Sequence, residues 1–195
     1  TAPLAPSAAR KTKNIGRILE TRAFMIFDFE IPGEPVAKGR PRFYGYRAVT
    51  PQHTRDAEEL VRNQFHMFYP DAKPLDGDVL MIVMFYKGRH GKPDLDNLEK
   101  LVKDALNGLA YVDDQQVKAT LCAMLEPDRM AWGARVKRLV KRRQGMPLTY
   151  GGVPYEPHTE IHVEPLQGTI HDGFHSINRT MGEMISDVGN KPEYR

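Results

Sequence analysis

Four aspartates and a lysine near the middle of this 195-residue chain are the residues best suited to chemistry. Asp94 and Asp96 are separated by one residue, Lys100 follows them, and Asp113 and Asp114 come after a helix-length interval. Carboxylates gathered this densely repel one another unless a cation lies among them. Their oxygen atoms are the ligands that hard divalent ions prefer, so the pattern predicts a Mg²⁺ site in which Mn²⁺ can substitute.

The residues between the two pairs of aspartates predict an amphipathic helix. Asp96 or Asn97 is expected to cap its N-terminus, and Gly108 lies near its expected end. Because a helix turns by about 100° per residue, Asp96 and Lys100 should face the same way, opposite the apolar stripe. That stripe comprises Leu98, Leu101, Val102, Ala105, Leu106 and Leu109.

The second pair of aspartates leads into a segment, 117–125, that is expected to form a strand. Successive side chains of a strand point to opposite faces, so only one of Asp113 and Asp114 should face Asp94 and Asp96. The alternation by itself does not choose between the two.

Acidic residues in such patterns also have ordinary structural roles. Most Asp-x-Asp pairs are solvated loop or capping residues, and it is the later Asp-Asp pair and the lysine one turn on that favour a metal site. Asp104 lies on the flank of the predicted helix, where pairing with Lys100 or Lys103 is the expected role.

A basic segment with interleaved aromatic residues precedes the first predicted helix. Lys38, Arg40 and Arg42 alternate, so an extended backbone would place all three on one face. Three aromatic residues lie within 43–46. The combination suits a rim that grips DNA phosphates and stacks on exposed bases. The alternative is a surface hairpin whose aromatic side chains are buried in the core.

The region 127–157 is a second basic segment, and its middle is expected to form a short basic helix with Val136, Leu139 and Val140 as a thin apolar strip. We interpret the region as an added arm that contacts DNA phosphates, with a solvated surface helix as the alternative. Trp132 lies beside its cations, which are Arg129, Arg135, Lys137, Arg138, Lys141, Arg142 and Arg143.

The apolar patterning predicts an α+β domain with a small mixed sheet flanked by helices. Residues 1–23 are expected to be a disordered N-terminal tail, 24–166 the folded domain with the basic insertion at about 127–157, and 167–195 a C-terminal tail. Met25 lies at the start of the first expected strand and is a candidate translation start. Strands are expected at 24–31, 79–86, 117–125 and 159–163, and helices at 51–68 and about 98–109.

The composition limits the class of protein. The formal net charge of +3 is concentrated in the basic segments, which favours a polyanionic partner such as DNA. The longest apolar runs are too short to span a membrane, and no secretory signal pattern is visible, so we expect a cytoplasmic protein.

The cysteine and the histidines do not indicate a disulfide or a zinc site. Cys122 is the single cysteine, which excludes an intrachain disulfide and suits a reducing compartment. His158 and His162, like His171 and His175, have a spacing that can bind zinc on a helix. The first pair lies on an expected strand and the second in an expected tail, so no zinc site is predicted.

The motif as a whole resembles that of the RusA family of Holliday junction resolvases. The family pattern Asp-Leu-Asp-Asn-Leu-x-Lys matches residues 94–100, and Asp-Asp-x-Gln-Val matches 113–117. The basic segment 35–43 resembles the start of many members, and the resemblance covers about 25–126 and the last strand near 158–164. It implies a RusA-like fold and a homodimeric, Mg²⁺-dependent nuclease that cuts four-way DNA junctions in a bacterial or phage-infected cell.

Carried over residue by residue, the resemblance implies metal carboxylates at Asp94, Asp96 and Asp114, with Asp113 as the alternative, and an essential lysine at Lys100. Carboxylate-bound Mg²⁺ activates water and neutralises charge at phosphorus, and a nearby lysine can orient the phosphate, so the chemistry agrees. A less selective nuclease that cuts flaps or forks is one alternative. A non-catalytic junction-binding protein with purely structural carboxylates is another.

Overall fold

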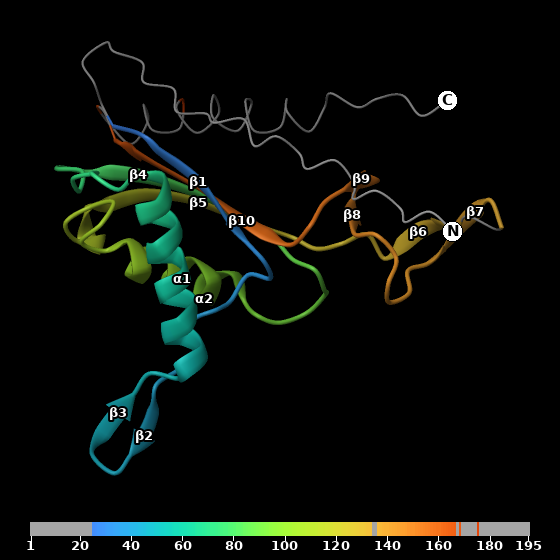
Figure 1. Cartoon of the computed structure of the whole chain (residues 1–195), viewed down its shortest axis with the longest axis horizontal. Coiled ribbons are helices and arrows are strands. Elements are labelled where there is room, and N and C mark those ends of the chain that lie inside the picture. The colour runs from blue at the N-terminus through green and yellow to red at the C-terminus, as the bar shows by residue number, and fades with distance from the viewer. Residues whose placement is uncertain (1–24, 134–135, 167, 169–174, 176–195) are drawn as a thin grey trace, which may run out of the picture.

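A four-stranded mixed sheet forms the centre of the fold, with strand order β1-β10-β4-β5 (Figure 1). The computed structural model describes residues 25–133, 136–166, 168 and 175. β10 (His158–Pro165) is antiparallel to both β1 (Phe27–Pro32) and β4 (Val79–Tyr86), whereas β4 and β5 (Val117–Leu125) are parallel. The expected α+β class with a small mixed sheet is confirmed.

The parallel pair β4 and β5 requires a crossover between them, and α2 (Leu95–Leu106) supplies it. The predicted apolar stripe holds this helix to the sheet, because Leu98, Leu101, Val102, Ala105 and Leu106 are all buried. The helix begins earlier than expected, with Asp94 rather than Asp96 or Asn97 at the capping position. This start places Asp96 inside the first turn.

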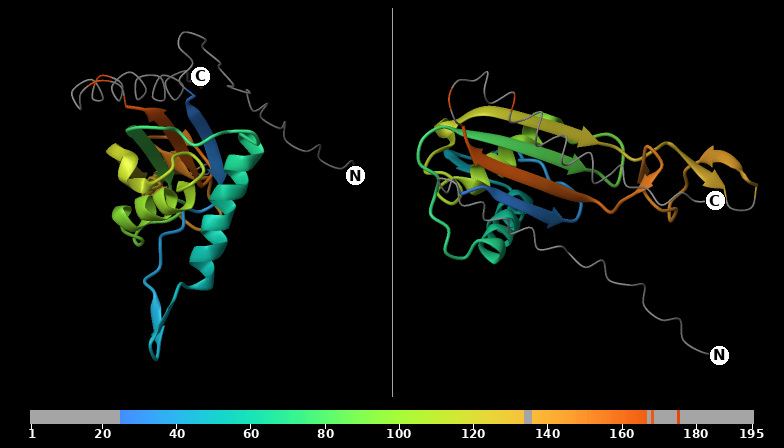
Figure 2. Two further views of the ribbon diagram at one scale, coloured as in Figure 1. Left: turned by 90° about the vertical axis from the view of Figure 1, so that its left-hand side faces the viewer. Right: turned by 90° about the horizontal axis from the view of Figure 1, so that it is seen from above.

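Both helices pack on one face of the sheet (Figure 2). The long helix α1 (Gln52–Phe68) buries Ala57, Val61 and Phe65 against the same core that holds α2. The Phe27 ring of β1 meets the rings of Phe65 and Tyr69 edge-on, with centroids 5.0 Å apart in each pair. This aromatic cluster fixes α1 across the edge strand of the sheet.

The opposite face of the sheet holds a smaller apolar cluster around Leu80 and Ile82, and one buried histidine. Nδ1 of His162 lies 2.7 Å from Asp28 Oδ1, and its Nε2 lies 3.5 Å from Glu164 Oε2. Burial lowers the pKa of His162, but its hydrogen bonds with the two carboxylates and their charges outweigh that effect and raise the pKa to about 9. His162 is therefore held as a cation within the sheet.

Two hairpin systems extend from this body. The hairpin of β2 (Arg42–Tyr44) and β3 (Arg47–Val49) lies in the first basic segment and precedes α1. The second basic segment is different: β6 (Met130–Gly133) pairs with β7 (Arg138–Lys141), and β8 (Thr149–Tyr150) pairs with β9 (Val153–Pro154). Figure 1 shows this second system, which we call the arm, beyond the end of the sheet.

The prediction of a short helix within the arm is wrong, because this segment forms the β6–β7 hairpin. Val136, Leu139 and Val140 have helical spacing, but Leu139 and Val140 instead pair with Trp132 and Ala131 across an antiparallel ladder. A stripe at helical spacing stabilises a helix only when a core covers it, and Val136 and Leu139 are exposed here.

Several expectations concern residues outside the described part of the chain. The whole predicted N-terminal tail, 1–23, lies there, as do most of 167–195 and the candidate DNA-contacting residue Arg135. Among the residues that are described, no helix is long and apolar enough to cross a membrane.

Candidate functional site

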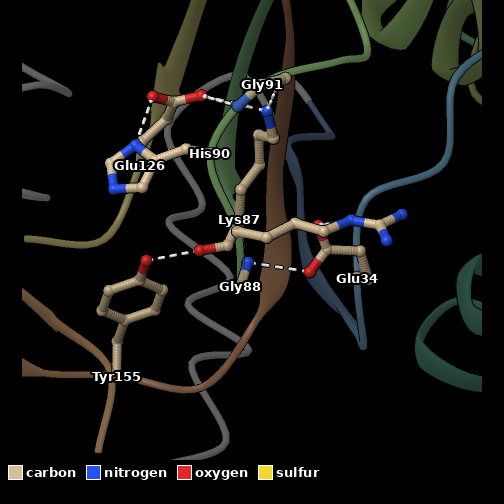
Figure 3. A network of polar contacts seen from close by, with 8 residues as sticks. Glu34, Lys87, Gly88, His90, Gly91, Glu126 and Tyr155 are labelled. Atoms are coloured by element: carbon tan, nitrogen blue, oxygen red, sulfur yellow. Dashed lines mark hydrogen bonds and ion pairs between the residues drawn. The ribbon is translucent and has the colours of Figure 1, made fainter. Parts of the chain in front are cut away.

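A polar network around the buried Lys87 fixes the loop that leads from β4 to the aspartate motif (Figure 3). The Lys87 side chain is fully buried, and its ammonium donates to the Gly91 carbonyl and lies 3.2 Å from Glu126 at the end of β5. Glu126 also lies 2.8 Å from His90 Nδ1 and accepts from Gly91 N at 2.9 Å. The hydrogen bond with His90 is the largest cause that lowers the pKa of Glu126 to about 2.

Glu34 and Tyr155 hold the same loop from the other side. Glu34 accepts a hydrogen bond from Gly88 N at 2.7 Å, and the Tyr155 hydroxyl donates to the Lys87 carbonyl. A Cβ at Gly88 would lie 2.7 Å from the Glu34 carboxylate and 2.9 Å from Pro157, so a larger residue would force these neighbours to shift. The loop 87–93 is thus fixed on both sides just before Asp94.

Asp94 and Asp96 are presented together at the start of α2. Asp94 has an extended backbone, with φ −76° and ψ 149°, and its side chain makes no capping hydrogen bond. Both carboxylates are exposed, and Lys100 is exposed one turn further on. The positive end of the helix dipole favours carboxylates at this position. The structure therefore brings Asp94, Asp96 and Lys100 together at the first turns of one helix.

Asp113 and Asp114 have different local roles. Asp113 caps the short 3₁₀ helix η1 (Asp114–Gln116): its carboxylate accepts from Gln115 N at 2.8 Å, and the Gln116 side chain accepts from Asp113 N at 2.9 Å. The Gln116 amide also donates to the carbonyls of residues 75 and 77 at 3.0 and 2.6 Å. Asp114 is exposed. The Asp113 carboxylate is therefore engaged in capping the turn.

The two halves of the motif lie at opposite ends of α2. Asp94 follows the end of β4, whereas η1 is bonded to the chain just before the start of β4. The 12 residues of α2 between them span about 18 Å at 1.5 Å per residue. Across 25–133, 136–166, 168 and 175, no three His, Cys, Asp or Glu side chains gather closely enough to hold a metal. Within one chain, Asp114 does not meet Asp94 and Asp96.

Lys38 connects the first basic segment to α2. Its backbone N–H donates to the Asn97 carbonyl at 2.9 Å, and its ammonium forms ion pairs with Asp104 and, at 3.2 Å, with Glu58. The expected pairing of Asp104 with Lys100 or Lys103 is therefore wrong, because Asp104 pairs with Lys38. The Lys38 charge is already neutralised by two carboxylates in this structure, whereas Arg40 is exposed.

Phe43 and Tyr46 of the first hairpin are not buried in the core, contrary to the alternative to a DNA-contacting rim. Phe43 is 76% exposed and Tyr46 is fully exposed at the turn. Both of these rings are therefore open to a ligand. The side chains of Tyr44 and of Arg42, a predicted DNA contact, lie outside the described part of the structure.

The cations of the arm divide into two groups. Lys137, Arg138, Lys141 and Arg143 are exposed, as DNA contacts must be. Arg142 instead binds the protein: its Nε donates to the Asp128 carbonyl at 2.8 Å, and its other nitrogens donate to the Met146 and Pro147 carbonyls and to Thr149. Arg142 is therefore a structural residue of the arm in this structure.

Sequence reasoning missed Lys87 and Glu126, although a signal was present. Each is a charged residue placed directly after one of the two adjacent apolar strands, β4 and β5. Because parallel strands end at the same edge of a sheet, two opposite charges in those positions are expected to meet. The first histidine pair makes contacts within the sheet. The His158 ring stacks on the Tyr86 ring with centroids 4.1 Å apart, and His162 binds Asp28.

Comparison with known proteins identifies the family. The family model described as endodeoxyribonuclease RusA matches residues 32–139, which is more than half of the chain and includes the whole aspartate motif. A relative is the uncharacterized protein YqaN of Bacillus subtilis strain 168, which is 35% identical over 115 residues, covering 46% of this chain and 80% of YqaN. The match of more than half of the chain shows that this protein belongs to the RusA endodeoxyribonuclease family.

Proposed function

We propose that this protein is a Mg²⁺-dependent, homodimeric endonuclease that resolves four-way DNA junctions by paired symmetric nicks. One observation carries the proposal: a chain of the RusA family presents Asp94 and Asp96, with Lys100 one turn later, as exposed side chains on a fixed helix start. Exposed carboxylates on a rigid element can meet a DNA backbone without rearrangement.

The donor set fits a magnesium ion. Asp94, Asp96 and Asp114 offer only oxygen ligands and are exposed. Bound Mg²⁺ would activate a water and neutralise charge on the scissile phosphate. Lys100 faces the same side of α2 as Asp96, so its ammonium can hold a phosphate oxygen and stabilise the charge that develops there. The ion pair between the buried Lys87 and Glu126 acts indirectly, by fixing the loop from which Asp94 projects.

A dimer would bring the third carboxylate to the site. Asp94 and Asp96 lie at one end of α2 and Asp114 at the other. A two-fold axis between two antiparallel copies of this region would place Asp114 of each beside Asp94 and Asp96 of the other, because an isologous interface repeats every contact. The dimer would then carry two complete sites, and each would be incomplete in a single subunit.

Two sites related by a two-fold axis suit a four-way junction. The junction itself is two-fold symmetric, and clean resolution requires nicks at equivalent positions in two opposing strands. A dimer with two identical sites matches that symmetry. The exposed cations of the first hairpin and the arm supply the phosphate contacts that hold the branched substrate.

Cleavage of an end-labelled synthetic four-way junction tests the proposal, with linear duplex of the same sequence alongside. Wild-type protein should give paired symmetric nicks only with Mg²⁺ or Mn²⁺, and Asp94→Asn should bind the junction without cutting it. Tight junction binding with no cleavage in either metal would contradict an enzyme and leave a binding protein. Equal cleavage of flaps, forks and junctions would contradict junction specificity.

A further inference from the structure

One face of the β6–β7 hairpin exposes a group of large apolar side chains. Trp132 is 64% exposed, Leu139 61% and Met130 45%. Trp132 lies directly opposite Leu139, and Met130 lies opposite Lys141. Because opposed residues of an antiparallel pair share a face, as do residues two apart along a strand, all four side chains stand on the same side. Apolar surface of this size left in water indicates a binding function.

The surroundings of this face are strongly basic. The segment 129–143 contains no acidic residue. Its described cations Lys137, Arg138, Lys141 and Arg143 are exposed, and Arg129 is exposed at the start of the hairpin. A second copy of the same surface would be repelled by these charges. The charge therefore favours a polyanion over a second arm as the occupant.

The arm is held rigid by hydrogen bonds that leave the apolar face free. The Asp128 carboxylate accepts from Gly151 N at 3.0 Å, Gly152 N at 2.9 Å and the Thr149 hydroxyl at 2.8 Å. Arg142 donates to the carbonyls of Asp128 and Pro147, at the base of the two hairpins. The two hairpins of the arm are thus fastened to each other at their base, and Trp132 is presented on a preorganised support.

Figures 1 and 2 show the β6–β7 hairpin beyond the end of the sheet where β5 ends and β10 begins. In that position it can reach DNA away from the body of the protein. A flat apolar face with one indole, framed by cations, has the composition of a surface on which unpaired bases stack while their phosphates are held by lysine and arginine. A regular duplex does not expose base faces, whereas a branch point can.

We propose that the β6–β7 face is a stacking platform for unpaired bases of branched DNA, with Trp132 against a base and Leu139 and Met130 beside it. The inference deepens the proposed function and rests on it for the branched substrate. Stacking on bases is a separate property from cleavage. Its test therefore uses binding alone and does not depend on nuclease activity.

Trp132 is the single tryptophan of the chain, so tryptophan fluorescence reports on this face alone. The full-length Asp94→Asn protein is titrated without divalent metal against three DNAs: an unpaired oligonucleotide, a four-way junction and a blunt linear duplex. Stacking should strongly quench the emission with the oligonucleotide and the junction, and the duplex should quench it weakly at equal saturation. Equal quenching by all three would overturn the proposal.

Substitutions supply the second measurement. Base–aromatic stacking is worth ~1–3 kcal/mol, so Trp132→Ala should weaken binding to the unpaired oligonucleotide about five- to 150-fold, and Trp132→Phe should restore most of it. Duplex affinity should be unchanged. Met67→Ala, which removes a similarly exposed apolar side chain from α1, is the matched control and should have no effect.

The two proposals fail in different ways. If Trp132→Ala binds the oligonucleotide as tightly as its parent, the stacking platform is wrong, whether or not wild-type protein cuts junctions. If the variant instead changes the sedimentation of the protein, the face is a protein interface and the proposal is also overturned. If the wild-type protein does not cut junctions but the unpaired oligonucleotide still quenches Trp132 more than the duplex does, only the proposed nuclease activity is contradicted.

Discussion

The separation of Asp114 from Asp94 and Asp96 makes a sharp prediction about mixed dimers. Ligand oxygens of one magnesium ion lie about 2.1 Å from it, so carboxylates that share an ion must nearly touch. The α2 helix, about 18 Å long, lies between the two halves of the motif in one chain. Each complete site should therefore combine Asp94 and Asp96 of one subunit with Asp114 of the partner subunit.

Asp94→Asn and Asp114→Asn should each be inactive, but a mixture of the two should regain activity. In a mixed dimer both substitutions fall in one site, and the other site is wild type. Free exchange of an equimolar mixture makes about half of the dimers mixed, so about a quarter of all sites should be intact. Because each mixed dimer has a single working site, the product should be a nicked junction rather than a resolved one.

The assay is cleavage of a labelled junction in Mg²⁺ after the variants have been mixed and exchanged, with one subunit tagged so that mixed dimers are isolated. Asp94→Asn mixed with Asp96→Asn is the matched control, because these substitutions damage one site each and no intact site can form. Isolated mixed dimers of Asp94→Asn and Asp114→Asn that remain inactive would refute the reasoning. Recovery in the control mixture would refute it equally.

Three further predictions follow from the local contacts. Asp113→Ala removes a cap and should cost about 1 kcal/mol in urea unfolding while junction cleavage persists; loss of cleavage at unchanged stability would contradict the capping role. Glu126→Gln leaves the buried Lys87 ammonium without its carboxylate and should lower the free energy of unfolding in urea by about 3–5 kcal/mol. A loss below about 1 kcal/mol would show that the pair does not fix the loop. The raised pKa of His162 predicts that its contribution to stability is complete below pH 6.5 and is lost as the pH rises to about 9, because deprotonation removes its ion pairs. In thermal melts at different pH values, His162→Gln should reduce the dependence of the melting temperature on pH between about 6.5 and 9.

The central elements were predictable because their patterns reflect burial in this same chain. β4 was expected as a central strand from its almost continuous apolar run, and its residues 79–83 are completely buried between β10 and β5. The α2 stripe likewise faces a core that its own neighbours provide. The arm has no such core beneath it, so spacing alone could not separate a helix from a hairpin, and cross-strand pairing and the Asp128 hydrogen bonds decided the outcome.

Residue types in the candidate site were readable from the sequence, but their distances were not. The one-turn spacing of Asp96 and Lys100 is set within a helix and follows from its geometry. The distance from Asp94 to Asp114 depends on the parallel crossover, which separates them by the length of α2. A charge that looks free in sequence can also be neutralised by residues far along the chain, as Lys38 is by Asp104, 66 positions away.

The choice between Asp113 and Asp114 shows how a local hydrogen bond can decide what periodicity leaves open. Strand alternation assigns the two side chains to opposite faces but gives no reason to prefer either. The chain does not enter β5 directly: it first makes the 3₁₀ turn η1, whose exposed N–H groups need an acceptor. Asp113 precedes that turn, and Gln116 completes the reciprocal bond. An Asp-x-x-Gln spacing is itself a capping signature, so residues 113–116 already indicated that Asp113 would cap this turn, which supports Asp114 as the proposed metal carboxylate.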